Sequence, residues 1–144
     1  VSGEMSFGAL PSAGSLYTRL EGHASASDRL WAAVRLTSTG TMQLTISQVV
    51  AGVQTDLKTV DVPGTYTPGS VLRLDLTIDQ AASAQALTAT LYALGQSTPI
   101  ASTSASSTAS SLQQAGAVGA SSYLSASATS PVVVSIDNLL VTKH

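Results

Sequence analysis

The 144-residue sequence contains no cysteine and has few charged or aromatic residues. The absence of cysteine excludes a disulfide scaffold, a thiolate metal site and cysteine catalysis. Charged residues make up 10 % of the chain, against about 25 % in an average soluble domain, so hydroxyls and small side chains must cover the surface. Aromatic residues make up only 4 %, and the core therefore has to be built from Val, Leu, Ile and Ala.

The few charges are also scattered, which excludes several classes of partner. Six basic and eight acidic residues give a net charge of −2, and no basic cluster could follow a phosphate backbone, so we expect no nucleic acid partner. No segment approaches the roughly 18 apolar residues of a transmembrane helix, and we expect no membrane insertion. A chain that opens at Val1 without a start Met or signal-peptide pattern indicates a mature product or an excised domain. Because a surface poor in charge suits proteins outside cells, we expect an extracellular location: secreted, on the cell surface or on a virion.

A period of two in the apolar residues predicts strands. Over residues 71–79, Leu74 and Leu76 belong to an apolar set that alternates with polar residues such as Asp75 and Asp79, which indicates a strand with one buried face. The regular spacing of such segments predicts a single all-β domain over residues 1–144, an antiparallel two-sheet sandwich or jelly roll. The expected strands lie near residues 1–8, 15–22, 29–37, 42–50, 56–62, 71–79, 86–94, 116–126 and 132–142.

Turn residues separate the predicted strands. Gly40 can adopt a positive φ in a tight hairpin turn, and Ala51-Gly52 is expected to close the next hairpin. Pro63-Gly64 is expected to end a strand, since proline lacks the N–H that a strand ladder needs. The segment 102–114 is so rich in Ser, Thr and Ala that we expect a long surface connection, with one short helical turn around residues 110–114.

Several blocks of sequence carry a resemblance to a known family. They are residues 112–119 (LQQAGAVG), 122–125 (SYLS) and 131–139 (PVVVSIDNL), together with 29–36 (RLWAAVRL) followed by Gly40, and 87–99. These blocks resemble concanavalin A-like (laminin G-like) jelly-roll modules of actinobacterial secreted proteins and of the minor tail proteins of their phages. The resemblance implies the sandwich fold and a non-enzymatic accessory or recognition role, without naming a ligand.

The resemblance also implies two features near the chain ends. Such modules normally have a further strand region before the part that resembles residues 1–9, so the sandwich is expected to be trimmed here or completed by another segment. Related jelly rolls often hold a structural Ca²⁺ with an Asp in the position of Asp137, and hard oxygen ligands suit this ion. The alternative is that Asp137 caps nearby amides at a strand end. Apart from such a calcium ion, we expect no cofactor.

No set of residues indicates catalysis. Asp75 and Asp79 share a strand face, but a glycosidase needs two carboxylates roughly 5–9 Å apart across a sugar-binding cleft. Such clefts are usually walled by aromatics, and this chain has only one Trp, four Tyr and one Phe. His23 could act as a base for a serine, but no G-x-S-x-G nucleophile elbow is present. We expect His23 to be an exposed loop residue and the chain not to be an enzyme.

A ligand-binding patch is predicted on one face of two strands. Its members alternate with apolar residues such as Leu20 and Leu30, so they should point to the opposite face. There an aromatic ring can stack on a sugar, and guanidinium groups can bind hydroxyls or carboxylates. The alternative is that Trp31 fills the contact with the second sheet and the arginines only solubilise the edge. The patch comprises Tyr17, Arg19, Arg29, Trp31 and Arg35.

Two functions fit these observations. One is a recognition module, glycan-binding or adhesive, within a larger secreted or phage tail protein, with a glycan or cell-surface polymer as its partner. The other is a structural or assembly module, such as a virion decoration, a tail spacer or a filament subunit, whose partners are other domains or copies of a larger assembly. The plain Ser/Thr/Ala surface favours the second function, and the predicted patch favours the first.

Overall fold

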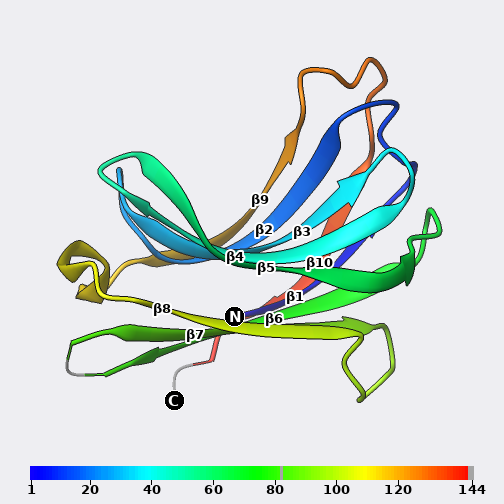
Figure 1. Cartoon of the computed structure of the whole chain (residues 1–144). Helices are drawn as coiled ribbons and strands as arrows, with labels where there is room; N and C mark the ends of the chain where they lie inside the picture. The colour runs from blue at the N-terminus through cyan, green and yellow to red at the C-terminus, as the bar shows by residue number, and fades with distance from the viewer. Residues whose placement is uncertain (82, 143–144) are drawn as a thin grey trace.

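A computed structural model, which describes residues 1–81 and 83–142, shows two antiparallel five-stranded sheets packed face to face (Figure 1). Sheet A has the order β10-β1-β6-β7-β8 and sheet B the order β5-β4-β3-β2-β9. The predicted all-β sandwich is therefore confirmed. Sheet A consists of β1 (Ser2–Phe7), β6 (Val71–Gln80), β7 (Gln85–Ala93), β8 (Ala101–Ser107) and β10 (Val134–Leu140), and sheet B of β2 (Ser15–Ala24), β3 (Arg29–Thr37), β4 (Thr41–Val50), β5 (Val53–Thr65) and β9 (Ala117–Leu124).

Hairpins build most of each sheet. Strands β2 to β5 follow one another in sheet B, and β6 to β8 do so in sheet A, while the chain crosses between the sheets after β1, β5, β8 and β9. Within the described residues the one helical element is the 3-10 turn η1 (Ser110–Gln113), on the crossing from β8 to β9. Its position confirms the short helical turn predicted around residues 110–114.

The core between the sheets is mostly aliphatic. Leu74 and Leu76 of β6 are 0 % and 1 % exposed, which confirms the predicted buried face of this strand. Phe7 and Tyr66 are its aromatic members, and their ring centroids lie 5.1 Å apart in an edge-to-face arrangement. From sheet B the core receives Leu16, Leu20, Leu30, Val34, Leu44 and Ile46, among others.

The segment predicted as a surface connection contains a strand instead. β8 pairs with β7 along its length, and its side chains alternate, since Thr103 and Ser107 are buried while Ser104 is exposed. Hydroxyl groups bond across the pair, as between Thr88 and Ser104 at 3.1 Å. The prediction was wrong because hydrophobic periodicity cannot reveal a strand whose two faces both carry Ser, Thr and Ala.

Two further expectations need correction. β5 runs on through Pro63 to Thr65, which an edge strand permits because half of its N–H groups need no strand partner. His23 lies not in a loop but within β2, at a bulge where its φ is 50° and the pairing with β9 shifts. The predicted turns at Gly40 and Ala51-Gly52 are confirmed, and all three residues have positive φ.

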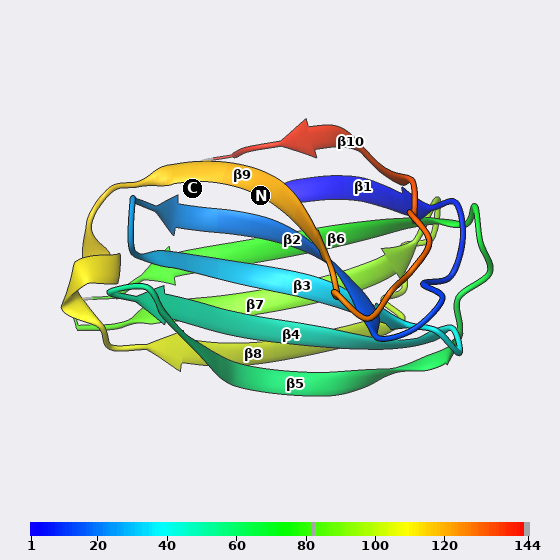
Figure 2. The same cartoon turned by 90° about the horizontal axis from the view of Figure 1, so that it is seen from above.

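The two long sides of the sandwich differ (Figure 2). On one side β5 lies over β8, and Leu57 and Ala105 pack against the core. On the other side β9 and β10 are the edges, and large apolar side chains there face solvent, with Val118 43 % and Leu140 58 % exposed. A hollow of about 990 Å³ lies on this side, lined in part by Val118, Leu140 and Ile78. The sandwich is thus closed along β5/β8 and open along β9/β10.

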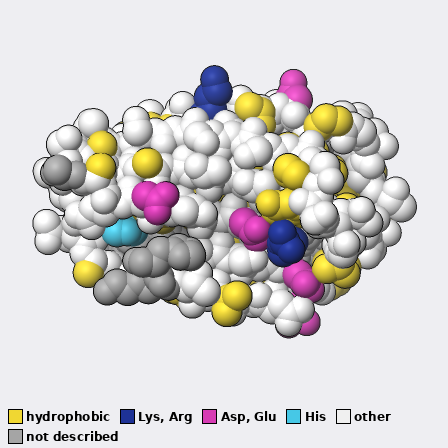
Figure 3. Space-filling model, turned by 90° about the horizontal axis from the view of Figure 1, so that it is seen from below, with side chains coloured by type: hydrophobic (Ala, Val, Ile, Leu, Met, Phe, Trp, Pro, Cys, Tyr) yellow, Lys and Arg dark blue, Asp and Glu magenta, His cyan; other side chains and the backbone are white. Residues whose placement is uncertain are grey.

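The outer face of sheet A carries few charges. Seen from below, a few acidic and basic side chains, some of them adjacent to one another, stand on a largely uncharged surface (Figure 3). The guanidinium carbon of Arg73 lies 4.1 Å from the ring centroid of Tyr92, and its Nε lies 3.2 Å from a carboxylate oxygen of Asp75. In the part of the chain that the structure describes, no helix is long and apolar enough to cross a membrane.

Candidate functional site

The outer face of sheet B is concave, because the ends of its strands bend away from sheet A (Figure 1). Side chains that alternate with the core residues point to this face, and the strand register arranges them in rows across the sheet. One row, from β9 to β5, consists of Tyr123, Tyr17, Arg35, Gln43 and Asp61. Rings, guanidinium, amide and carboxylate groups therefore meet on one surface.

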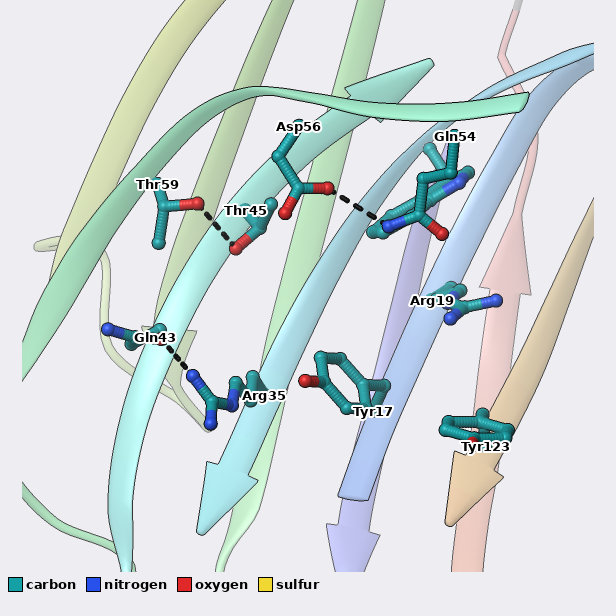
Figure 4. A pocket seen from close by; sticks show the side chains of 10 residues that line it. Tyr17, Arg19, Arg35, Gln43, Thr45, Gln54, Asp56, Thr59 and Tyr123 are labelled. Atoms are coloured by element: carbon teal, nitrogen blue, oxygen red, sulfur yellow. Dashed lines mark hydrogen bonds between the residues drawn. The ribbon is translucent and has the colours of Figure 1, made fainter. Parts of the chain in front are cut away.

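A hollow of about 270 Å³ lies in the middle of this face and is termed the trough (Figure 4). In the row that passes beneath it, Ala33 stands between Arg19 of β2 and Thr45 of β4. Because Ala33 ends at Cβ, space opens between its larger neighbours. The residues that line the trough are Tyr17, Arg19, Trp31, Arg35, Gln43, Thr45, Gln54, Asp56, Thr59 and Tyr123.

Trp31 lies beneath Arg19 rather than on the open surface. Its ring belongs to the trough and not to the core cluster, yet it is only 2 % exposed. The guanidinium carbon of Arg19 covers it, 4.6 Å from the ring centroid. The expectation of an exposed stacking ring is therefore wrong, and so is its alternative, that Trp31 fills the contact between the sheets. The ring serves as a platform that positions Arg19.

Two arginines face the trough and are held in different ways. Arg35 is fixed by hydrogen bonds, since its Nε donates to Ser15 Oγ and its Nη1 donates to Gln43 Oε1, both at 2.9 Å. Arg19 is held mainly by stacking on Trp31, and its Nε is buried without a hydrogen-bond partner. Among the described residues, neither arginine forms a salt bridge. The β2/β3 part of the trough therefore carries uncompensated positive charge.

Two tyrosines form an aromatic rim next to these arginines. The ring centroids of Tyr17 and Tyr123 lie 6.1 Å apart at an interplanar angle of 44°. Tyr123 is 51 % exposed, whereas Tyr17 is half-buried between its neighbours. Exposed and half-buried ring faces of this kind can pack against the apolar face of a ligand.

The β4/β5 wall of the trough carries hydroxyl, amide and carboxylate groups. Oδ1 of Asp56 accepts hydrogen bonds from Ser47 Oγ at 2.7 Å and from Gln54 Nε2 at 3.0 Å. The hydroxyls of Thr45 and Thr59 lie 3.0 Å apart (Figure 4). The trough is thus asymmetric, with guanidinium groups at its β2/β3 end and carboxylate and hydroxyl groups toward β5.

Four of the five residues predicted as a patch line the trough. Arg29 does not: it lies at the start of β3, where its Nη1 is 3.6 Å from Glu21 Oε2. The sequence predicts the hairpin partners of β3 and the strand after residue 116, but alternation within one strand does not tell which side chains of other strands lie beside the patch. The lining residues that were missed are Gln43, Thr45, Gln54, Asp56, Thr59 and Tyr123.

Asp137 lies on sheet A and caps an amide. Its Oδ1 accepts a hydrogen bond from the Asn138 N–H at 2.7 Å, at a bulge where Asn138 has a φ of 50°. Asn138 Nδ2 in turn donates to Glu4 Oε2 at 2.8 Å. Across the described residues, no group of three His, Cys, Asp or Glu side chains is placed to hold a metal ion. Calcium binding at Asp137 stays a prediction.

The residues weighed for catalysis lie outside the trough. Asp75 accepts a hydrogen bond from Ser2 Oγ at 2.6 Å and pairs with Arg73 on sheet A. Nδ1 of His23 lies 2.8 Å from the carbonyl oxygen of Gln114, near the end of β2. Neither Asp75 nor His23 is among the lining residues, and no histidine of residues 1–81 and 83–142 lines the trough.

Comparison of the chain with protein-family models, curated proteins and solved structures finds no match. The resemblance to concanavalin A-like modules therefore stays a hypothesis based on the sequence blocks. Function has to be inferred from the geometry and chemistry of the trough.

Proposed function

We propose that this chain is a non-catalytic recognition module that binds a saccharide in the trough of sheet B. The observation that carries the proposal is an aromatic rim next to hydrogen-bonding walls around one hollow. Tyr17 and Tyr123 offer ring faces to the apolar side of a sugar. Arg35, Gln43 and Asp56 offer donors and acceptors that can bind sugar hydroxyls. The volume of about 270 Å³ suits a short stretch of a saccharide rather than a protein surface.

The trough is also largely preorganised, which favours binding because little side-chain order must be created. Arg35 is fixed by Ser15 and Gln43, and Asp56 by Ser47. These groups lie on adjacent strands of a continuous ladder, so the sheet itself holds their spacing. Sites built on such rigid elements position ligand groups more precisely than sites built on loops.

The resemblance supports the same proposal from the sequence. Concanavalin A-like modules are accessory or recognition domains, and the blocks that carry the resemblance include β3 and β9, which both contribute to the trough. By this resemblance the chain is a module of a larger extracellular protein, either a secreted protein or a phage tail protein. Its partner is then a glycan or a cell-surface polymer.

A broad glycan array, followed by titration of each ligand that binds, tests this proposal. Tyr123→Ala should weaken binding about 3- to 10-fold, the loss expected for one aromatic contact, and should leave the melting temperature unchanged because the ring is half exposed. The matched control is Tyr92→Ala on the outer face of sheet A, which should leave affinity unaltered. An array without any saccharide ligand would reject the proposal, as would equal effects of the two variants.

A second candidate function, an assembly module, is supported by the open β9/β10 side. Leu139 and Leu140 are 46 % and 58 % exposed at the end of an edge strand, and exposed apolar edges promote association. The occupant that fits is a second copy, because two β10 edges can pair antiparallel across a two-fold axis and bury both pairs of leucines. Sedimentation velocity over a range of concentrations tests this candidate. A dimer that Leu140→Asp dissociates would support it, and a monomer throughout would reject it.

A further inference from the structure

Within the described residues, the positive charge of Arg19 in the trough has no carboxylate partner. Its guanidinium group stacks between aromatic neighbours, 4.6 Å from the centroid of Trp31 and 6.0 Å from that of Tyr17. The Nε atom is buried and has no hydrogen-bond partner. A partly buried cation without a counter-charge is costly, because it loses hydration and gains no ion pair in return.

A buried Nε without a hydrogen-bond partner also occurs in Arg29 and Arg73. Within the described residues, Arg19 differs from these two arginines because it has no carboxylate beside it. Arg29 pairs with Glu21 at 3.6 Å. Arg73 on sheet A stacks on Tyr92 much as Arg19 stacks on Trp31, but Asp75 lies 3.2 Å from it. Arg73 thus combines stacking on an aromatic ring with a carboxylate partner. Among the described residues, Arg19 has the stacking but no carboxylate partner.

The acidic groups on the same strand as Arg19 and on the opposite wall of the trough bind other residues. Glu21, the next outward-facing residue on β2, pairs with Arg29 and accepts a hydrogen bond from Ser121 Oγ at 2.5 Å. Asp56 accepts bonds from Ser47 and Gln54 at the opposite wall. Arg19 and Arg35 together thus make the β2/β3 end of the trough positive.

Resting on the proposed saccharide site, we infer that the ligand is an acidic saccharide whose carboxylate binds Arg19. A guanidinium group presents paired N–H donors that match the two oxygens of a carboxylate, and such charge-assisted bonds are about twice as strong as neutral ones. Asp56 on the β5 wall repels a carboxylate and accepts bonds from hydroxyls. The uronate group therefore lies over β2, and neutral hydroxyls of the same ligand lie toward β5.

Matched pairs of saccharides test this inference on the full chain. The probes are oligomers of galacturonate, alginate and hyaluronan, each compared with its carboxyl-reduced form, with sulfated and plain dextran as further arms. At least one uronate oligomer should bind, and reduction of its carboxyl groups should weaken binding about 10- to 100-fold, the range for a hydrogen bond to a charged group. Affinity should also fall as NaCl rises from about 0.05 M to about 0.5 M, because salt screens charge attraction.

Variants assign the effect to Arg19. Arg19→Gln should abolish the preference for the acidic form, whereas Arg73→Gln, which removes the same charge from a stacked arginine outside the trough, should leave it intact. Arg19→Lys keeps the charge but loses the paired donors, and should retain salt dependence with reduced affinity. Melting temperatures within a few degrees of the unmodified chain exclude unfolding as the cause.

The outcomes separate this inference from the function on which it rests. Equal binding of acidic and reduced forms, or binding of sulfated dextran alone, would overturn the carboxylate inference and leave saccharide binding standing. A preference for uronates that survives Arg19→Gln would also overturn it. Binding of no saccharide in any arm would overturn both.

Discussion

At the scale of single residues, Trp31 shows that alternation along a strand predicts the face of a side chain but not its burial. Alternation places its ring on the face opposite the core. Its burial depends on the pairing of β2 with β3, which sets Glu21 opposite Trp31 and Arg19 opposite Ala33. Arg19 then lies diagonal to Trp31 and can lean over the ring, since Ala33 leaves room. Such diagonal contacts need the register, which the sequence of one strand does not contain.

Trp31 is expected to stabilise the fold. Because the ring is 2 % exposed, Trp31→Ala should lower the free energy of unfolding by about 3–5 kcal/mol, the usual cost of truncating a buried aromatic residue. Urea unfolding followed by circular dichroism measures the change. Tyr123→Ala, which removes a half-exposed ring from the same face, is the control and should have little effect. A Trp31→Ala variant as stable as the unmodified chain would show that the ring is not a structural platform.

Tyr66 is a second residue whose role follows from its contacts. Its hydroxyl accepts a hydrogen bond from the Phe7 N–H at 2.9 Å and donates to the carbonyl oxygen of Ser70 at 2.5 Å. The side chain is 5 % exposed, and burial raises the pKa of the Tyr66 phenol above its usual value. The hydroxyl thus fastens the loop between β5 and β6 to the end of β1.

Tyr66→Phe should therefore lower the free energy of unfolding by about 1–3 kcal/mol at neutral pH, because it leaves the Phe7 N–H and the Ser70 carbonyl without this partner. The variant should also change how the free energy of unfolding depends on pH in the alkaline range. A phenol whose pKa is higher in the folded state favours folding below pH 10 or so and loses this contribution as pH rises through the folded pKa. Stability measured between neutral and alkaline pH should fall less steeply for Tyr66→Phe. Parallel curves for the two proteins would contradict the assignment.

At the scale of elements, the sequence predicts strands well where apolar and polar residues alternate. β6 is the clearest case, with Leu74 and Leu76 inside and Asp75 and Asp79 outside. Alternation does not predict β8, because its inward residues Thr103, Ala105 and Ser107 are similar in polarity to its outward serines. Its strand conformation comes from pairing with β7 and from the cover of β5, both of which are tertiary contacts.

A pair of substitutions tests the two faces of β8. Thr103→Asp would place a charge where the side chain is 7 % exposed, and should lower the free energy of unfolding by at least about 2 kcal/mol because the charge has no partner there. Ser104→Asp places the same charge on the solvent face of the next residue and should change stability little. Thermal unfolding of both variants gives the comparison. Equal, small effects would indicate a mobile connection rather than a strand.

At the scale of the whole molecule, alternation and turns predict the sandwich but not the composition of the trough. Two of the six basic residues in the chain, Arg19 and Arg35, face this hollow. Only the order β5-β4-β3-β2-β9 brings them beside Gln43, Asp56 and Tyr123, which come from three other strands. The sequence predicts a hairpin between residues 42–50 and 56–62, so the β4/β5 wall could have been predicted. The place of Tyr123 beside Tyr17 could not have been predicted, because β9 pairs with β2 only after the chain crosses from sheet A.

The molecule also presents two surfaces with different chemistry. The trough on sheet B is polar and aromatic, whereas the open β9/β10 side exposes apolar residues such as Val118 and Leu140. The two proposed functions, saccharide recognition and assembly, would therefore use separate surfaces and do not exclude each other. A module that presents its trough outward while its open side contacts another polypeptide would serve both.

The most direct test of the central claim is chemical-shift mapping of the labelled chain with a saccharide from the array. Amide and side-chain signals of Tyr17, Arg19, Arg35, Gln43 and Tyr123 are predicted to shift and saturate with one dissociation constant. Signals of β10 and of the residues that line the open side are predicted to stay in place. Shifts confined to β10 and the open side, with the trough residues unchanged, would contradict saccharide recognition by the trough.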